Sequence, residues 1–464
     1  MSAAPADFTF SNYHSDLMSR DAKSVMGWRY NPPIVFKGGR GTKLIDVEDN
    51  EYYDLTSGMM TMVLGHSHPE LTDTMKSQAE LLVHTSSWYS NPWAIELAEL
   101  LGSTLPGNLK MVNYAVTGSE ANEIAFRMAL AATGKYDIVS VIRGLHGGSL
   151  GAEAVTTVGG GRKNKLGPLM MPASSASILG PMCYRCPVNL TYPGCKIGCL
   201  DTSEQLMDFL TSQDVAAIIA ETVLAAGGMV VPPKEWWPKL QDLAKRWGAL
   251  LIVDEVQMAP SRTGSLWGFE NYDVMPDIIT FGKGMSAGFG LCGTITTTEI
   301  ADEVRGQCGL PWAGTYSADP FPSAVALKQL QIILRDKLTE RAAEIGKFIN
   351  TELTKRIAPY EPIGDIRGIG MYHMLDVVTD RVTKRPDPEM AERIRYNMML
   401  NGVCTIAVKN YIRFVPPLII TEAEVDDIIG RMEISIKRAM DGFPRDVDFR
   451  ASSSLAMGER VAAE

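Results

Sequence analysis

The middle of the chain alternates short runs of apolar and β-branched residues with longer segments of helical periodicity. The short runs lie at residues 136–142, 215–221, 250–256 and 277–283. Strands with apolar residues at nearly every position are buried on both faces, so these runs predict a mostly parallel sheet covered by helices. The segment KEWWPKLQDLAKRWG, between two of the runs, is amphipathic and ends at Gly248, which is typical of a helix that connects parallel strands. We therefore expect an α/β fold.

The segments on either side of this region follow different patterns. Residues 33–58 alternate polar and apolar side chains between turn residues, as in an antiparallel meander. After about residue 330 the pattern changes to a long helical segment, then to strands and a last helix, which predicts a smaller α+β domain. The expected divisions are an N-terminal segment joining the small domain (1–64), a large domain (65–330), the C-terminal small domain (331–445) and a disordered tail (446–464).

Composition and charge narrow the class of partner. The chain has 464 residues, of which 45% are hydrophobic and 21% charged, as in ordinary globular proteins. Its net charge of −10 argues against nucleic acid or an anionic membrane as a partner, because both attract basic surfaces. The sequence contains neither a secretory signal pattern nor a run of ~20 apolar residues that could span a membrane. We expect a cytoplasmic protein that binds small molecules.

Four of the seven cysteines are close together in the sequence. Cys183, Cys186, Cys195 and Cys199 follow the spacing C-x2-C-x8-C-x3-C, which could present four thiolates to zinc. A zinc-organised binding protein is therefore the non-enzymatic alternative for this chain. The spacer between the two pairs is shorter than in the usual zinc patterns. We expect a surface loop with incidental thiols and no metal site.

Two charged residues end predicted buried strands. Asp254 follows the run LLIV, and Lys283 follows DIITFG. Open α/β sheets bind ligands at the carboxyl ends of their strands. A buried aspartate requires a cationic partner, and a lysine in apolar surroundings has a lowered pKa that favours attack on a carbonyl. The pair predicts pyridoxal 5'-phosphate, with Lys283 as the Schiff-base lysine and Asp254 as the partner of the pyridine nitrogen.

The motif TGSEAN at residues 117–122 offers a place for the phosphate of this cofactor. Gly118 permits close approach of the backbone, Ser119 offers a hydroxyl, and both open a predicted helix whose N-terminal end attracts anions. The same letters also suit an ordinary helix cap. Because Asp254 and Lys283 are also present in this chain, we favour the phosphate site.

Six separated blocks resemble, in this order, the motifs of class III pyridoxal-phosphate aminotransferases of fold type I. The blocks are AVTGSEANEIAFRMA, LHGGS, LLIVDEVQMAPSRTG, DIITFGKGMSAG, GTYSADPFPSAVAL and IRFVPPLIITEAEVDDI. The resemblance covers residues 25–440, and YYDLTSGMMTMVLGHSHPEL and DPFPSAVAL are most similar to dialkylglycine decarboxylase. It implies a large domain with a mostly parallel sheet, a smaller α+β domain, and a homodimer with shared active sites, or a tetramer.

The resemblance also implies the reaction. An amine or amino acid donates its amino group to a 2-oxo acid such as pyruvate, through pyridoxamine phosphate. The two alternatives are decarboxylation-dependent transamination of the dialkylglycine decarboxylase type and racemisation or epimerisation of an amino acid on the same scaffold.

By resemblance, several residues contact the cofactor. Lys283 transfers a proton as well as forming the Schiff base, Gln257 bonds the ring hydroxyl, and Val256 packs on one ring face. Glu221, at the end of a predicted strand, orients the ring-hydroxyl network or is a solvated strand end. Thr315 matches a threonine that reaches a phosphate across a dimer interface.

Other matched positions contact the substrate or differ from the family pattern. Arg413 matches the arginine that holds a substrate carboxylate through a bidentate pair, with a strand-edge charge as the alternative. Met59 replaces a glutamine that steers the scissile carboxylate of the decarboxylase, and Leu145 replaces an aromatic residue over the cofactor. Both changes predict a wider and more apolar pocket, and they favour transamination without decarboxylation.

Two further positions allow more than one interpretation. His146 either tunes the cofactor ring or is a hydrogen-bonded core histidine. Ser86, Thr315 and Asp319 match positions that hold an alkali cation in the decarboxylase, whereas His84 differs from the leucine found there.

Overall fold

The computed structural model describes residues 10–26, 34–158, 175–309 and 313–444. The chain forms two compact units. The central unit is Pro69–Glu340, and the terminal unit combines the chain up to His68 with the chain from Arg341 onwards. The domain boundaries expected from the sequence stay predictions, and the expected tail, 446–464, lies outside the described residues. Within the described ranges, no helix is both long and apolar enough to cross a membrane.

The central unit is built on a seven-stranded sheet with the strand order β4-β10-β9-β8-β7-β5-β6. The strands are β4 (Leu109–Ala115), β5 (Asp137–Val141), β6 (Ser175–Ile178), β7 (Val215–Glu221), β8 (Leu250–Asp254), β9 (Ile278–Phe281) and β10 (Cys292–Thr297). Strands β5 to β9 run parallel, whereas β10 is antiparallel to both of its neighbours. All four strands predicted from apolar runs are confirmed.

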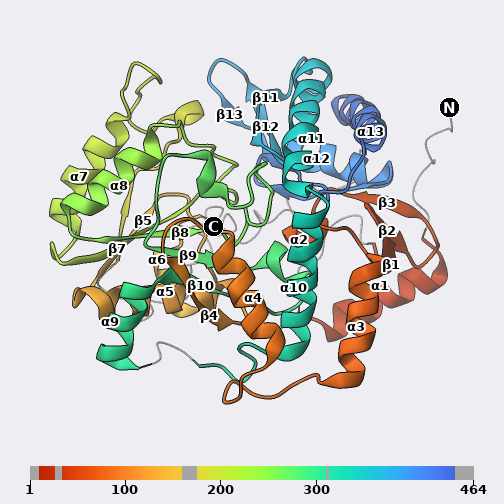
Figure 1. Ribbon diagram of the computed structural model, residues 1–464. Coiled ribbons are helices and arrows are strands. Elements are labelled where there is room, and N and C mark those ends of the chain that lie inside the picture. Colours follow the sequence, from red (N-terminus) through yellow and green to blue (C-terminus); the bar gives the residue numbers. More distant parts are fainter. Residues whose placement is uncertain (1–9, 27–33, 159–174, 310–312, 445–464) are drawn as a thin grey trace. The chain divides into compact units, whose positions relative to one another are not determined.

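Helices cover both faces of this sheet (Figure 1). One face packs against α4 (Pro92–Ser103), α7 (Gly198–Leu210), α8 (Trp236–Arg246) and α10 (Pro320–Arg335), and the other packs against α5 (Gly118–Thr133), α6 (Leu150–Val155) and α9 (Thr298–Cys308). Neighbouring residues of one strand divide between the two cores: Val253 of β8 belongs to the first and Ile252 to the second. A strand in this position needs apolar residues on both faces, which is why the runs are continuous.

Shorter elements complete the central unit. Helix α3 (Pro69–Leu81) packs on α10, and three 3-10 turns are η3 (Cys183–Arg185), η4 (Gly268–Asn271) and η5 (Lys283–Ser286). The long helical segment expected near residue 330 is divided into α10 and α11 (Leu338–Glu352). The reason is local, because Lys337 has a left-handed φ of 51° that a right-handed helix cannot include.

The terminal unit contains two small sheets and several helices. The first sheet contains β1 (Phe36–Arg40), β2 (Lys43–Asp46), β3 (Glu51–Asp54) and β14 (Val403–Cys404). The second contains β11 (Ile363–Ile369), β12 (Tyr372–Asp380), β16 (Tyr411–Phe414) and β15 (Ala407–Val408), with β13 (Arg385–Pro386) paired to β12. The helices are α1 (Asn12–Ser24), α2 (Ser57–Met60), α12 (Pro388–Leu400), α13 (Glu422–Met440) and the π-helical turn η6 (Leu353–Ile357) after α11. The predicted meander is confirmed as β1–β3, and β3 pairs in parallel with β14, so strands from the two ends of the chain share one sheet.

The short helix α2 is left-handed. Its residues, Ser57–Met60, have φ values of 46°, 57°, 59° and 70°. Each non-glycine residue in this conformation costs about 1–2 kcal/mol, so surrounding groups must hold it in place. One of these is the Ser57 hydroxyl, which donates to the Val415 carbonyl oxygen at 2.6 Å. The turn presents the Met59 side chain, which is 51% exposed.

The buried carboxylate of Asp54 holds the same turn. Its Oδ1 accepts hydrogen bonds from the backbone N–H and the hydroxyl of Thr56, at 2.8 and 2.6 Å. Its Oδ2 accepts from the Gly58 N–H and from His66 Nε2, both at 2.9 Å. Burial raises the pKa of Asp54, but the hydrogen bonds from His66 and Thr56 outweigh it and lower the pKa below its ordinary value. The strained turn is thus tied to an ionised group.

We expect Asp54→Asn to lower the free energy of unfolding at pH 7 by about 1.5–3 kcal/mol, because hydrogen bonds to a buried charge are lost. The native pKa is depressed, so this stabilisation is present above the unfolded-state pKa near 4 and disappears as the pH falls through the native pKa. Unfolding midpoints at pH 7 and at about pH 2, below the unfolded-state pKa and towards the native one, measure the effect, with the exposed Asp16→Asn as control. A loss of the same size at both pH values would contradict it.

Candidate active site

The central unit contains a cavity of about 250 Å³ at the carboxyl ends of its parallel strands. Its lining residues are Gly118, Ser119, Asn122, Leu145, His146, Gly147, Gly148, Asp254, Val256, Gln257, Lys283 and Cys292. All of these were predicted as site residues from the sequence except Asn122, Gly147, Gly148 and Cys292. The cavity therefore brings together residues from five separate stretches of the chain.

Asp254 is the buried acid of this cavity and is only 3% exposed. Its Oδ2 accepts hydrogen bonds from Asn122 Nδ2 at 2.9 Å and from His146 Nδ1 at 2.8 Å, and its Oδ1 accepts from the Val256 N–H at 3.0 Å. Burial raises the pKa of the carboxyl, but the hydrogen bond and charge of His146, followed by the Val256 N–H and Lys283, bring it below its ordinary value. Asp254 is therefore an ionised carboxylate inside the protein.

His146 is both buried and hydrogen-bonded. Besides its bond to Asp254, its backbone N–H donates to Thr156 Oγ1 at 3.0 Å. Its Nε2 is buried and has no hydrogen-bond partner in the part of the chain that the structure describes. The core-histidine interpretation is confirmed in its geometry, and the acid to which His146 is bonded is the one predicted to face the cofactor ring. An effect of His146 on the ring stays a prediction.

Asn122 is a site residue that the sequence reasoning missed. Its amide nitrogen donates to the His146 carbonyl oxygen at 2.6 Å as well as to Asp254, and its Oδ1 accepts from the Thr280 hydroxyl at 2.9 Å. It thereby links β8, β9 and the loop after β5. The signal was present in the motif TGSEAN, because Asn122 lies one helical turn beyond Gly118 and Ser119 on α5.

Lys283 follows the end of β9, the strand next to β8, and is half-buried. Its φ of 39° is left-handed, which is strained for lysine. The Ser286 hydroxyl donates to the Lys283 carbonyl oxygen at 2.8 Å and supports this turn. Just before it, a Cβ on Gly282 would lie 2.6 Å from the Cys292 sulfur, so only glycine fits there. The backbone around Lys283 is thus held in one position.

Glu221 ends β7, directly beside Asp254 in the sheet register, and is 2% exposed. Its two carboxyl oxygens accept from the Leu145 N–H and from Gln257 Nε2, both at 2.9 Å. Burial raises its pKa to about 7. The alternative of a solvated strand end is wrong, because the carboxyl is buried and bonded. Glu221 positions Gln257 and the backbone of Leu145 at the cavity wall.

The N-terminus of α5 borders the cavity. Thr117 is the helix cap, and a reciprocal pair of bonds with Glu120 completes a capping box. The cap is therefore the residue before Gly118 and Ser119, which leaves these two in the first turn, where backbone N–H groups lack helical partners. A Cβ on Gly118 would lie 2.8 Å from Val256 Cγ1. This position accordingly requires glycine.

Ser119 connects the helix to the loop after β5. Its hydroxyl oxygen accepts from the Gly148 N–H at 3.0 Å. Gly147 has a φ of 144°, and a Cβ there would collide with the Ser119 side chain. At one corner of the cavity, the backbone of Gly118 and Gly147 and the N-terminus of α5 are thus left uncovered by side chains. This arrangement suits an anion.

Arg413 and Met59 belong to the terminal unit and not to the unit that contains the cavity. Arg413 lies on β16, which is paired on both sides, and is 4% exposed. The strand-edge interpretation is therefore wrong. Its Nη1 lies 3.7 Å from the Met60 sulfur, whereas its Nε is buried without a hydrogen-bond partner, and no carboxylate of the described residues forms an ion pair with it. A buried cation of this kind is costly unless an anion joins it.

Thr315 and the positions matched to a cation site lie elsewhere in the central unit. Thr315 is exposed and is not among the residues that line the cavity, so its predicted role across a dimer interface stays a prediction. His84 Nδ1 lies 2.6 Å from Asp319 Oδ1. Asp319 matches an alkali-ion ligand of the decarboxylase, and one of its two carboxylate oxygens is therefore bonded to His84.

We expect Asn122→Ala to lower the free energy of unfolding by at least about 2 kcal/mol, because it leaves the Thr280 hydroxyl and the His146 carbonyl unpaired. Thr280→Val is the matched control, since it removes a single bond to Asn122 and should cost about 1 kcal/mol. Chemical denaturation of both variants measures the difference. Equal losses would show that Asn122 is not the centre of this network.

Comparison with known proteins identifies the family. The family model for Aminotransferase class-III matches residues 25–436. Alanine–glyoxylate aminotransferase 2 of Homo sapiens is 30% identical, with 94% of this chain and 90% of that protein covered. Alanine/serine racemase of Pyrococcus horikoshii is 32% identical over 88% of this chain and 87% of its own length.

A solved structure agrees with these relatives. An (S)-enantioselective omega-transaminase from Thermomicrobium roseum superimposes with a TM-score of 0.87 at 30% identity, over 94% of this chain and all of that one. The particular likeness to dialkylglycine decarboxylase is not confirmed by these comparisons. The chain belongs to the class-III aminotransferase family and is an enzyme, an aminotransferase with the α/β fold of fold type I.

Proposed function

We propose that this aminotransferase binds pyridoxal 5'-phosphate in the cavity of the central unit and transfers an amino group from an amine or amino acid to a 2-oxo acid such as pyruvate. The main support for this proposal is the buried Asp254 carboxylate. It stays ionised at the end of β8, the strand next to the one that Lys283 follows. When bound, the cofactor supplies an aldehyde that accepts the amino group and a protonated ring that withdraws electrons from the adjacent carbon.

The cavity fits this group chemically. Asp254 would pair with the ring nitrogen, because a buried carboxylate favours a cationic partner. Gln257, which Glu221 orients through a 2.9 Å bond, would contact the ring hydroxyl. Val256 and Leu145 supply apolar side chains at the cavity wall, against which a flat ring can pack. These roles rest on the chemistry of the lining and on the family resemblance.

The phosphate would bind at the start of α5. Gly118 and Ser119 lie in its first turn, and Gly147 lies close to the Ser119 side chain. Unpaired N–H groups and the positive end of a helix dipole attract a dianion. The exposed Thr315 would add a hydroxyl to the phosphate of a partner subunit, so we also propose a homodimer.

Lys283 would hold the cofactor covalently through its amine and move the proton at the substrate carbon. A positioned amine is an efficient base when the surrounding protein holds it near the proton it removes. The strained backbone at Lys283 fixes where that side chain starts, with φ at 39°. The enzyme therefore has one residue for both covalent attachment and proton transfer.

Arg413 would bind the carboxylate of the 2-oxo acid or amino acid. Its buried guanidinium has an unpartnered Nε, and a carboxylate can satisfy such a fork with two parallel bonds. Met59 and Leu145 are apolar where the decarboxylase has glutamine and an aromatic residue. We propose that the enzyme accepts bulky apolar donors and does not decarboxylate them.

The cellular location that we propose is the cytoplasm. All seven cysteines are free thiols, which fits a reducing compartment.

Racemisation is the second candidate, because a relative at 32% identity is named alanine/serine racemase. It requires a proton donor on the cofactor face opposite Lys283 in addition to the lysine itself. No lining residue has been assigned that role, so we place it second. Chiral analysis of the amino acid recovered from an aminotransferase assay separates the two reactions.

Lys283→Ala should lose the visible absorbance of the bound cofactor, fail to retain it after borohydride reduction, and lose turnover by at least ~10³-fold. The cause is the missing amine, since the rest of the cavity is unchanged. Absorbance, intact mass after borohydride and amino transfer to pyruvate measure these effects, with the exposed Lys110→Ala as control. A variant that still retains the cofactor after borohydride would refute the assignment of Lys283.

Arg413→Leu should raise KM for pyruvate by about 10- to 100-fold and leave KM for an amine donor without a carboxylate nearly unchanged, because one bidentate pair is worth ~1.5–3 kcal/mol. Arg413→Lys is the matched control, which keeps the charge but loses the fork. Steady-state kinetics with both substrates give the two KM values. An equal rise in KM for both substrates would indicate a general loss of structure and contradict the assignment of Arg413.

A further inference from the structure

The long loop between β6 and α7 carries three cysteines, and a fourth, Cys199, lies in the first turn of α7. None of the four belongs to the cavity or to the proposed chemistry. The loop's only regular element is η3 (Cys183–Arg185), and much of it, including residues 189–194, is exposed. Ordered loops of this length usually have a function or an internal support. The apolar core offers little support here, because few of its side chains are buried.

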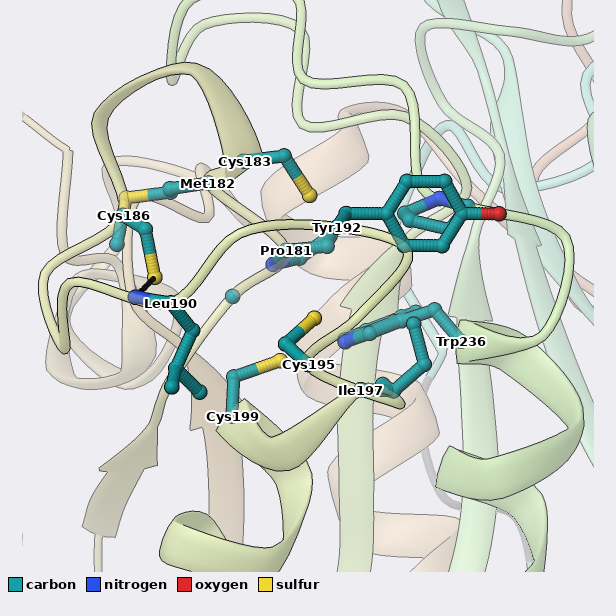
Figure 2. Close-up of a pocket in the computed structure, with 12 residues that line it drawn as sticks. Pro181, Met182, Cys183, Cys186, Leu190, Tyr192, Cys195, Ile197, Cys199 and Trp236 are labelled. Carbon is teal, nitrogen blue, oxygen red and sulfur yellow. Dashed lines mark hydrogen bonds between the residues drawn. The ribbon is translucent and has the colours of Figure 1, made fainter.

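All four cysteines line one small pocket of about 20 Å³ beneath the loop (Figure 2). The other lining residues are Gly180, Pro181, Met182, Leu190, Tyr192, Ile197, Pro233 and Trp236. A space of this size holds about one water-sized guest. None of these residues also lines the larger cavity, so the two sites are separate.

The thiols approach this pocket from two sides. Figure 2 shows the Cys183 sulfur on one side, and the Cys195 and Cys199 sulfurs together on the other. The Cys186 sulfur accepts a hydrogen bond from the Leu190 N–H at 3.4 Å. Backbone N–H groups bonded to sulfur stabilise thiolate ligands in metal sites. The thiols are free, and none is joined in a disulfide.

The backbone between the last two cysteines is strained in a way that directs both toward the pocket. Lys196 and Ile197 have left-handed φ values of 49° and 59°. This conformation is an outlier for a β-branched residue such as Ile197. Lys239 Nζ donates to the carbonyl oxygens of both residues, at 3.2 and 3.4 Å, and supports the bend. Strain of this kind persists where a functional arrangement requires it.

We propose that Cys183, Cys186, Cys195 and Cys199 bind one structural zinc ion that fastens this loop. Zinc takes four thiolates in closed structural sites, and the two cysteine pairs come from short turns that face one pocket. Among the described residues, no three acidic, histidine or cysteine side chains already have metal-ligand geometry, so binding must draw the thiols together by side-chain rotation. The short eight-residue spacer is no obstacle, because its exposed tip folds back over the pocket.

The test uses the full-length enzyme with its cofactor, expressed with added zinc and dialysed. Elemental analysis should give about one zinc per chain, and zinc-edge X-ray absorption should give four sulfur neighbours at ~2.3 Å. Cys183→Ser and Cys199→Ser should each lose most of the zinc. Cys308→Ser, an exposed cysteine outside the loop, is the matched control and should keep it.

Three results would overturn the proposal. The first is a wild-type enzyme with less than roughly a tenth of a zinc per chain. The second is a sulfur count below four by X-ray absorption, which needs no variant and so does not depend on whether the variants fold. The third is an intact mass, measured without reductant, that falls below the mass of the fully reduced chain by the hydrogens lost when one or two disulfides form. Amino transfer is not the readout, so the outcome is independent of the proposed function.

Discussion

The candidate active site depends on a carboxylate kept ionised inside the protein. Asp254 is almost fully buried, and removing a charge from water costs several kcal/mol unless other groups replace the solvent. His146, Asn122 and the Val256 N–H do so, and they come from different segments of the central unit. Asp254 can therefore keep its charge in the protein interior only when the segments that carry these donors have packed around it. Folding and the proposed cofactor chemistry thus rest on the same contacts.

Left-handed backbone occurs at two places to which we assign functional side chains. Lys283 has a left-handed φ in the central unit, and the turn Ser57–Met60 repeats that conformation four times in the terminal unit. Both are held by polar groups, the Ser286 hydroxyl in one case and the Asp54 carboxylate in the other. Ile197, beside the proposed zinc ligands, has the same backbone conformation. In each place the surrounding fold offsets the free-energy cost of the left-handed backbone and fixes the direction of a side chain.

The network behind Asp254 also gives two neighbouring buried carboxyl groups different pKa values. Glu221, with a pKa raised to about 7, and the ionised Asp254 lie side by side at the ends of β7 and β8, yet their environments differ. His146 and Asn122 donate to the aspartate, whereas Glu221 receives the Gln257 amide and the Leu145 N–H. The two adjacent acids therefore differ in pKa because their hydrogen-bond partners differ.

The sequence alone determined the α/β class, the buried strands and most of the cavity lining. A strand buried on both faces needs apolar residues throughout, and parallel strands bring their carboxyl ends to one edge, so Asp254 and Lys283 could be placed near each other. Only the tertiary structure decided the contacts of Asn122, which bonds an acid 132 residues away, and the burial of Arg413, for which an edge charge had been the alternative interpretation. It also decided that four cysteines share a pocket. Periodicity specifies which face a residue occupies, but distances between segments follow from how whole elements pack, and local patterns carry no record of that packing.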